Sequence, residues 1–292
     1  MPSAPIFVSG IGRTSVRAVA QVINHSGALR DVFEPFDNVR NRECKRFRLG
    51  RYLRPRARDA DLMRPANRIL TGELQSAWSD QFNAAPRDSP LVIRECRSNL
   101  WLGWLHSAFP FVKIVFVIRH PCAVAESRRL VESPTRLRRY LAQPELLEDL
   151  LGPYKTALLE TDDPFERHVY SWCVEHFAPF AQLAADDCHV LFYEDLIATP
   201  VPAARGLFEF LGDPAGIDSV ESIAASPEMR ERRAVLDVWR KRVDDAHRAR
   251  ARAILRRFGM GALYREDETP DREAALRLFA RTTATSAAAP SA

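Results

Sequence analysis

The sequence has little lysine, few cysteines and no long uninterrupted apolar run. Arginine supplies nearly all of the positive charge, a bias typical of a high-GC bacterial genome, and only four lysines occur (Lys45, Lys113, Lys155, Lys241). The cysteines are odd in number, scattered and free of any CxxC pair (Cys44, Cys96, Cys122, Cys173, Cys188). This excludes a disulfide framework and a zinc site, and it predicts a reduced cytoplasmic protein.

Membrane and nucleic-acid classes are also disfavoured. The most apolar stretch, 99–118, contains His106, Pro110 and Lys113, so it divides better into a helix, a turn and a strand than into one membrane span. The first residues lack the basic segment and the apolar length of a signal peptide. A net charge of +4 is too small to indicate nucleic acid. We expect a protein with no membrane span and no nucleic-acid partner.

Short β-rich runs alternate with helical patterns, which predicts one α/β domain with a central parallel sheet flanked by helices and a helical C-terminal third. The expected strands are 5–9, 29–33, 90–94, 112–118 and 188–193. The expected helices are 14–24, 65–82, 98–107, 121–131, 164–185, 202–211 and 228–258. Segment 37–61 is predicted to be an exposed loop. The predicted domain is 1–264, followed by a partly disordered tail, 265–292, whose end from Thr282 is rich in Ala, Ser and Thr.

The first candidate site follows the first strand, where Gly10, Gly12, Arg13, Thr14 and Ser15 precede a helix. Free N–H groups at a helix start favour an anion, and the glycines let the backbone approach a phosphate. Arg13 adds a fixed positive charge, while Thr14 and Ser15 offer hydroxyls. The segment lacks the Gly-Lys-Ser/Thr ending of a Walker A motif, and an ordinary strand-to-helix turn stays an alternative.

A second candidate site follows the strand 112–118. Arg119 ends that strand, and Ser127 lies two turns into the next helix. Ligands of open α/β sheets bind beyond the carboxyl ends of the strands, where both side chains are expected. The partner of Arg119 is either a phosphate or a carboxylate in a structural ion pair.

A third candidate is Glu34, which ends the second strand at the same edge of the sheet. A carboxylate there can act as a general base on an acceptor hydroxyl, although a Glu before Pro35 is also a common turn residue. The following segment, Arg40–Arg58, has nine Lys or Arg residues and one acid. It either attracts an acidic acceptor or forms a solvated loop.

Together these stretches resemble the sulfotransferase family that uses 3′-phosphoadenosine 5′-phosphosulfate (PAPS). The glycine turn with Arg13 looks like the family's 5′-phosphosulfate loop. The element from Arg119 to Ser127 looks like its 3′-phosphate site. The segment around Glu34, Phe-Glu-Pro-Phe, is similar to a Gly-Glu-Pro-Phe stretch whose glutamate is the family's catalytic base.

Further stretches fit the same family in the same order. Arg94 stands where the resemblance implies a strand-end lysine, which gives it a role toward the sulfuryl group or the acceptor. Segment 191–196 is close to the family's Tyr-Glu-Asp-Leu strand end. Arg230 and Arg232 lie where the family often places a loop that closes over the nucleotide, although a solvated basic helix face is the alternative. The resemblance implies a P-loop-like three-layer fold.

One departure from the family concerns the first loop. Members usually read Gly-x-x-Arg-Ser-Gly-Thr-Ser/Thr, whereas here Arg13 is followed by Thr14, Ser15, Val16 and Arg17. Either the Ser-Gly pair is deleted, or Ser15 replaces the glycine while Val16 and Arg17 replace the hydroxyl residues. We prefer the deletion, since Thr-Ser then falls into register.

The resemblance implies transfer of the sulfuryl group of PAPS to a hydroxyl or amine of a small-molecule, sugar or lipid acceptor, with release of adenosine 3′,5′-bisphosphate and no metal. A degenerate, non-catalytic nucleotide-binding member is the main alternative, because the first loop is atypical. A P-loop kinase or NTPase is less favoured, since no Gly-Lys-Ser/Thr ending and no Mg²⁺-binding aspartate after a strand are seen. The sequence carries no indication of oligomeric state.

Overall fold

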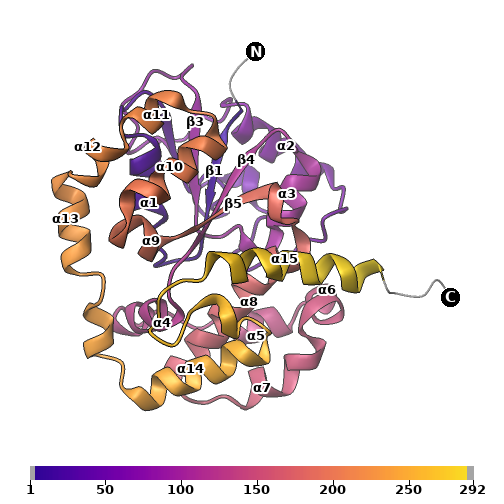
Figure 1. The fold of residues 1–292 in the computed structure, drawn as a ribbon. Helices are drawn as coiled ribbons and strands as arrows, with labels where there is room; N and C mark the ends of the chain where they lie inside the picture. Colours follow the sequence, from indigo (N-terminus) through magenta and orange to yellow (C-terminus); the bar gives the residue numbers. More distant parts are fainter. Residues whose placement is uncertain (1–3, 288–292) are drawn as a thin grey trace.

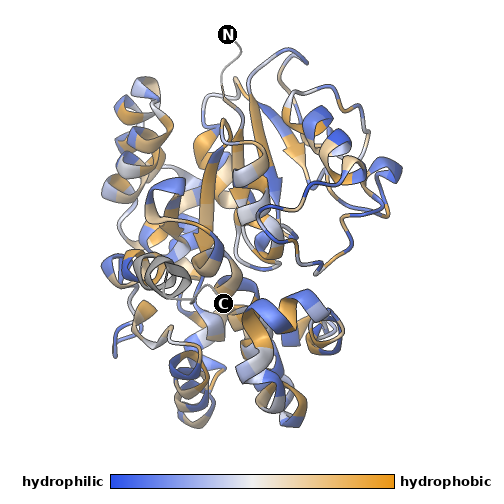
Figure 2. Ribbon diagram, turned by 90° about the vertical axis from the view of Figure 1, so that its right-hand side faces the viewer, coloured by the Kyte–Doolittle hydropathy of each residue, from blue (hydrophilic) through white to orange (hydrophobic). Residues whose placement is uncertain are grey.

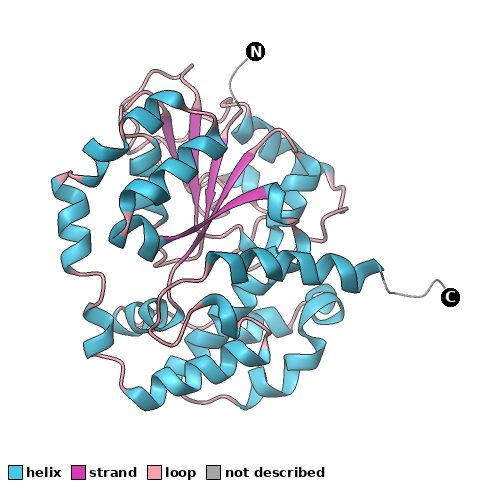
Figure 3. Ribbon diagram, in the orientation of Figure 1, coloured by secondary structure: helices cyan, strands magenta, loops and turns pink. Residues whose placement is uncertain are grey.

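Five parallel strands form the centre of the molecule (Figure 3). The computed structural model describes residues 4–287, and for 280–287 the backbone alone. The strand order is β2-β3-β1-β4-β5. The strands are β1 (Ile6–Ser9), β2 (Arg30–Phe33), β3 (Leu91–Glu95), β4 (Lys113–Ile118) and β5 (Cys188–Phe192). All five lie where the sequence predicted strands, within one or two residues at each end.

Helices cover both faces of the sheet, and its central strands are mostly apolar and largely orange in Figure 2. In β4, Phe116 packs in the cluster with α3 (Leu102–Ala108) and α8 (Pro164–Gln182). Its neighbours Val115 and Val117 pack in the opposite cluster, with α1 and α10. These helices are α1 (Val16–Ile23) and α10 (Pro200–Leu211). The arrangement is the predicted three-layer P-loop-like α/β fold with a parallel sheet (Figure 1).

The lower part of Figure 1 is helical. There α8, a 19-residue helix, packs against α4 (Pro121–Leu130) and α14 (Asp245–Arg257). The chain also has short helices: α5 (Leu137–Leu141), α6 (Pro144–Leu146), α7 (Lys155–Glu160), α9 (Tyr193–Ala198), α11 (Pro214–Asp218) and α12 (Val220–Ala224). No helix of the described residues is long and apolar enough to cross a membrane.

The last described helix, α15 (Arg272–Ala287), belongs to the segment that the sequence analysis set apart as a tail. Its Phe279 is fully buried and meets the ring of Phe180 in α8 edge-on, with ring centroids 4.8 Å apart. The structure therefore packs the first part of this segment on the core, and residues 288–292 of the predicted tail lie outside the described residues.

The loop at 37–61 differs from the prediction, because it is anchored rather than exposed. Phe47, Tyr52 and Leu53 are at most 4% exposed. The ring of Phe47 packs on Trp101 and Trp104, with centroids 5.2 and 5.6 Å away. These anchors are single residues spaced without a helix or strand period, so periodicity alone does not reveal them. Only α2 (Ala60–Leu70) and a short 3₁₀ turn, Arg42–Cys44, give this region regular structure.

Two predicted helices are wrong in extent. The helix predicted at 65–82 is α2, which begins at Ala60 and ends before Gly72, whose φ of 78° stops a helix. The helix predicted at 228–258 is broken into α13 (Pro227–Ala234), a 3₁₀ turn at Val238–Lys241, and α14. Helix α14 starts after Asp244, because the side chain of Asp244 accepts a hydrogen bond from the backbone N–H of His247.

Candidate active site

A pocket of about 400 Å³ opens at the carboxyl ends of the parallel strands. Arg13, Glu34, Arg94 and Arg119 all line it. They follow or end four neighbouring strands, β1, β2, β3 and β4. Ser15 and Gly12 line it as well. The structure thus brings together residues that the sequence analysis selected from four separate motifs.

The first loop owes its shape to Thr14. The Thr14 hydroxyl donates to the carbonyl of Ile11 (2.7 Å) and accepts from the backbone N–H of the same residue (3.1 Å). Thr14 is fully buried, so its hydroxyl closes the turn instead of facing the pocket. A Cβ on Gly10 would lie only 2.5 Å from the Thr14 hydroxyl oxygen. Gly10 is therefore required by packing, whereas a Cβ on Gly12 would meet no atom within 4 Å.

The loop presents unpaired N–H groups. Arg13 and Ser15 have left-handed backbones, with φ of 80° and 67°. No described residue accepts a hydrogen bond from the backbone N–H of Gly12, Arg13, Ser15 or Val16. Successive free N–H groups before a helix start, together with the helix dipole, form an anion site.

The backbone of Ser15 bears on the alignment of the loop with the family motif. Its left-handed φ is a conformation that glycine favours. This fits the register without a deletion, in which Ser15 stands at the motif's glycine and Thr14 at its serine. The geometry therefore favours the alignment that the sequence analysis placed second. In that register Val16 and Arg17 occupy the positions of the hydroxyl residues.

Arg119 and Ser127 connect the second motif to the first loop. The Nε of Arg13 donates to the Ser127 hydroxyl (2.8 Å), and a terminal nitrogen of Arg119 donates to the carbonyl of Arg13 (3.0 Å). The Nε of Arg119 is buried and has no partner in the described part of the chain. Its guanidinium carbon lies 5.1 Å from the ring centre of Tyr193. Arg119 thus keeps donor capacity at the pocket.

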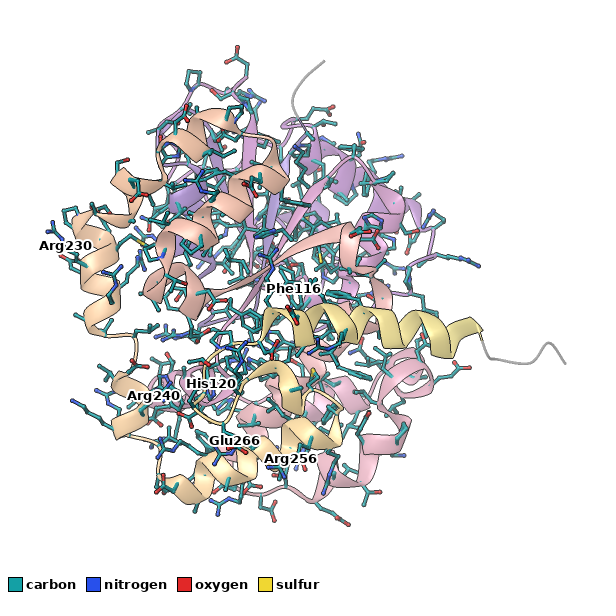
Figure 4. The ribbon with its side chains drawn as sticks, viewed as in Figure 1. Phe116, His120, Arg230, Arg240, Arg256 and Glu266 are labelled. Carbon is teal, nitrogen blue, oxygen red and sulfur yellow. The ribbon has the colours of Figure 1, made fainter. Side chains whose placement is uncertain are left out.

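Buried groups fix the chain just after β4. The backbone N–H of His120 donates to Glu194 (2.8 Å), and the indole of Trp172 donates to the carbonyl of Arg119 (2.9 Å). Burial raises the pKa of Glu194 to about 7. The His120 ring stacks on Trp239 with centroids 4.4 Å apart, and burial lowers the pKa of His120 well below its ordinary value. Figure 4 labels His120 below the sheet. This support sets the position of Arg119.

Glu34 has a left-handed backbone (φ 37°) and a side chain that is 14% exposed. One carboxylate oxygen lies 3.1 Å from a terminal nitrogen of Arg97, and the other accepts a hydrogen bond from the Cys96 thiol (2.7 Å). Burial raises the pKa of the Cys96 thiol, so it stays a donor. Arg97 also pairs with Asp37 at 2.8 Å. The carboxylate is held at the pocket wall by two groups that follow β3.

Glu95 is a fully buried neighbour of this pair. Burial, and next the charge of Glu34, raise the pKa of Glu95 to about 8. Its oxygens accept hydrogen bonds from the backbone N–H groups of Phe36 and Arg97, both at 3.1 Å. Glu95 thereby ties the segment after β2 to the segment after β3.

Arg94 reaches the pocket but its guanidinium is already engaged. Its Nε donates to Asp31 on the neighbouring strand (2.7 Å). The guanidinium carbon lies 4.5 Å from the ring centre of Phe33 and 4.6 Å from that of Phe82. The side chain is only 4% exposed. Arg94 therefore braces this edge of the sheet.

Arg230 and Arg232 are not brought to this pocket. They lie on α13, and Figure 4 shows Arg230 at the outer edge of the molecule. Arg230 is exposed, while Arg232 donates to Gln21 on α1 (2.9 Å). Their predicted contact with a nucleotide requires α13 to move.

The sequence analysis missed Arg17, Cys96 and Arg97. Arg17 and Cys96 line the pocket, and Arg97 contacts Glu34. A usable signal exists for each: Cys96 and Arg97 directly follow β3 at the edge where the other motifs lie, and Arg17 falls in the first turn of α1. No group of three or more His, Cys, Asp or Glu that could hold a metal occurs among the described residues.

Comparison with known proteins places this geometry in a family. A model of the sulfotransferase family matches residues 5–216, more than half of the chain. No curated protein sequence matches. Solved structures with a detectable likeness include a sulfotransferase domain from the curacin biosynthetic pathway (15% identity, 78% of this chain and 77% of that chain, TM-score 0.43). A sulfotransferase domain of the Synechococcus PCC 7002 olefin synthase is also similar (16% identity, 88% and 95% covered, TM-score 0.44).

A sulfotransferase from Alicyclobacillus acidocaldarius is a third such structure (14% identity, 85% of this chain and 100% of that chain, TM-score 0.40). At these values the structures add nothing to the assignment, which rests on the extent of the family match. The match spans all five strands, including Arg94 in β3, and the loops that carry Arg13, Glu34 and Arg119. The chain therefore belongs to the sulfotransferase family.

Proposed function

We propose that this protein is a PAPS-dependent sulfotransferase that acts on a hydroxyl or amine of a small-molecule, sugar or lipid acceptor. One observation supports the proposal most: Arg13, Glu34 and Arg119 line one pocket where neighbouring parallel strands end. Anion-binding groups and a carboxylate in one cleft are what sulfuryl transfer needs, because such reactions depend on positioning and charge stabilisation. In this proposal the protein is a cytoplasmic bacterial enzyme that requires no metal.

The first loop would hold the 5′-phosphosulfate. The Arg13 and Ser15 side chains and the free N–H groups of Gly12, Arg13, Ser15 and Val16 form a donor set whose charge suits that group. When bound, PAPS supplies a sulfuryl group activated by its anhydride bond to the 5′-phosphate. The donors would stabilise the negative charge on the bridging oxygen. Gly10 and Thr14 serve the same site by holding the turn.

Arg119 and Ser127 would bind the 3′-phosphate, which distinguishes PAPS from ATP. Arg119 lines the pocket, and no carboxylate of the described chain pairs with its guanidinium, whose natural acceptors are phosphate oxygens. Ser127 accepts from Arg13 in this structure, and its own hydroxyl hydrogen can be donated. In the same proposal Arg230 and Arg232 approach the nucleotide when α13 closes.

Glu34 would take the proton of the acceptor. Its carboxylate sits in the pocket wall, and Arg97 and Cys96 hold its two oxygens in place. A base fixed by hydrogen bonds is pre-oriented for proton transfer. Arg94 lies beside Glu34, whose backbone N–H donates to the Arg94 carbonyl (2.9 Å), and would stabilise charge there, although its ion pair with Asp31 limits how far it can reach.

The alternative of a non-catalytic nucleotide-binding member has a specific observation in its favour. The hydroxyl of Thr14 is used within the turn, and Val16 and Arg17 follow where family members carry hydroxyl residues. Such a protein would bind the nucleotide with no turnover.

Calorimetry with adenosine 3′,5′-bisphosphate, AMP and ATP tests the proposal. We expect the bisphosphate to bind at least about tenfold more tightly than AMP, because a hydrogen bond to a charged group contributes roughly 1.5 kcal/mol or more. Equal affinities for all three nucleotides would remove the role given to Arg119 and Ser127.

Catalysis is tested with Glu34→Gln and labelled PAPS against a panel of acceptors. The variant should keep nucleotide affinity and lose roughly 10²–10⁴-fold in transfer rate. Full turnover by the variant would mean that another residue is the base, whereas binding without turnover by the native protein would support the non-catalytic alternative.

A further inference from the structure

A second cavity, of about 760 Å³, lies next to the pocket of the proposed active site. Five arginines line it: Arg46, Arg48, Arg51, Arg97 and Arg139. The other lining residues are polar amides, small residues and aliphatic side chains, and none of the lining residues carries a carboxylate. We call this cavity the arginine pocket.

The positive charge of the arginine pocket is only partly neutralised. Arg46 pairs with Asp59 at 2.6 Å, and Arg97 pairs with Glu34 and Asp37. Within the described chain, Arg48, Arg51 and Arg139 form no ion pair. Burial, and next the charge of Arg46, lower the pKa of Arg51.

The pocket is held in shape by contacts between two distant segments. The amide of Gln143 donates to the carbonyl of Gly50 (2.8 Å) and accepts from the backbone N–H of Tyr52 (2.8 Å). Arg139 donates to the carbonyl of Leu49 (2.9 Å). These bonds fix the arginine-bearing loop before any ligand arrives, which reduces the entropy lost on binding.

Arg97 links the arginine pocket to the proposed base. It lines the arginine pocket, and its terminal nitrogen lies 3.1 Å from the carboxylate of Glu34, which lines the first pocket. A molecule in the arginine pocket therefore lies beside the group that would remove a proton from it. The first pocket, lined by Arg13 and Arg119, is taken by the nucleotide in the proposed function.

We propose that the arginine pocket binds the acceptor and that the acceptor is an anion, a hydroxyl or amine compound that already carries a phosphate or sulfate ester. This inference rests on the proposed function and names its substrate class. Planar guanidinium groups make paired hydrogen bonds to tetrahedral oxyanions, and three arginines without an ion pair offer enough donors for one such group. A neutral sugar or lipid would leave these charges facing each other without a counter-ion.

The test uses calorimetry on the full chain in two steps. Adenosine 3′,5′-bisphosphate is titrated first, and this step alone examines the proposed function. Glucose 6-phosphate, glucose 6-sulfate and glucose are then titrated into the nucleotide-saturated protein. We expect both esters to bind at least about tenfold more tightly than glucose, and this preference should shrink as salt is raised.

Arg48→Gln and Arg139→Gln are the test variants, and Arg138→Gln is the matched control. Arg138 is exposed, lies on α5 beside Arg139 and does not line the pocket. Each test variant should weaken ester binding by roughly tenfold, while the control changes it less than about twofold. Nucleotide affinity should stay unchanged in all three variants. Arg48 is exposed and its side chain makes no hydrogen bond to a described residue, so its replacement leaves the fold intact.

Two results would overturn the inference while the proposed function stands. One is nucleotide binding accompanied by no preference of either ester over glucose. The other is a preference that Arg48→Gln and Arg139→Gln leave untouched. If the nucleotide fails to bind in the first step, the proposed function fails, and the ester titration still reports on the arginine pocket by itself. If glucose 6-phosphate bound more tightly than glucose and glucose 6-sulfate did not, the acceptor class would be narrowed to phosphate esters.

Discussion

Replacing Arg119 with methionine separates a ligand-binding role from a structural one. The native side chain makes one hydrogen bond, to the carbonyl of Arg13, and lies over the Tyr193 ring. The hydrogen bond contributes about 1 kcal/mol to stability, and the contact of the guanidinium with the ring contributes about 0.5–1 kcal/mol. The buried, unpartnered Nε costs about 1–3 kcal/mol, which the methionine relieves. The opposing contributions nearly cancel, so we expect the melting temperature to change by no more than about 3 °C.

The same change should weaken nucleotide binding strongly. Losing a guanidinium that binds a phosphate removes roughly 1.5–3 kcal/mol, which corresponds to a roughly 10- to 150-fold higher Kd for adenosine 3′,5′-bisphosphate. Affinity for AMP should change little, because AMP has no 3′-phosphate. Arg205→Met is a suitable control, since Arg205 is an exposed arginine on α10.

Calorimetry and thermal unfolding of the two variants measure both effects. A lower melting temperature with unchanged bisphosphate affinity would show that Arg119 has a structural role, through its bond to the carbonyl of Arg13 and its contact with the Tyr193 ring. An equal loss for AMP and for the bisphosphate would place Arg119 away from the 3′-phosphate. Either result would refute the reasoning that connects its free nitrogen to the nucleotide.

Three further changes have defined outcomes. Gly10→Ala places a Cβ 2.5 Å from the Thr14 hydroxyl oxygen, so it should lower the free energy of unfolding in urea by roughly 1–3 kcal/mol and also weaken nucleotide binding. A variant as stable as the native protein would contradict this packing. Arg94→Met should lower stability by roughly 2–4 kcal/mol because it strands Asp31, which is 19% exposed, and Asp31→Asn should recover part of the loss. Glu95 has a pKa raised to about 8, so its contribution to stability is complete below about pH 4.5 and falls until about pH 8. As pH rises across this window, the stability of Glu95→Gln relative to the native protein should therefore increase, by up to about 1.4 kcal/mol per pH unit. A stability difference that does not change with pH would count against the raised pKa.

The sheet could be predicted from the sequence because its strands are buried on both faces. Five consecutive apolar residues of β4, from Ile114 to Ile118, are fully buried, and such a run is typical of a strand at the centre of a parallel sheet. The order of the motifs along the chain then places Arg13, Glu34 and Arg119 at one edge. This part of the site follows from the general rule that the carboxyl ends of parallel strands meet.

The partners of the site residues could not be predicted, because they depend on side-chain direction. Arg94 and Arg97 both follow from one strand, yet the first pairs with Asp31 and the second with Glu34. The two arginines are only three positions apart in the sequence, and the periodicity of the sequence does not indicate which of them contacts the proposed base. The hydroxyl of Thr14 was likewise expected to face a ligand, and a bond within its own turn uses it.

The sequence indicated only some of the residues that line the arginine pocket. The density of arginine in 40–58 indicated an acidic partner or a solvated loop. The structure pairs two of these nine residues with carboxylates, Arg46 with Asp59 at 2.6 Å and Arg54 with Asp149 at 2.7 Å. It places Arg48 and Arg51, which have no such partner among the described residues, in the wall of the cavity. Arg139 joins them from a helix far along the chain, and a local count of charges does not find it.

The bonds between Gln143 and the loop at Gly50 join two walls of the arginine pocket, which come from segments far apart in the sequence. The loops after β1 and β4 carry the proposed donor site, while 38–51 and 139–143 support each other through Gln143 and Arg139. Substrate preference could thus be re-engineered by transplanting those two segments as a pair. A transplant of one alone would leave the carbonyl of Gly50 or the amide of Gln143 unmatched, so chimeras with single swaps should express poorly.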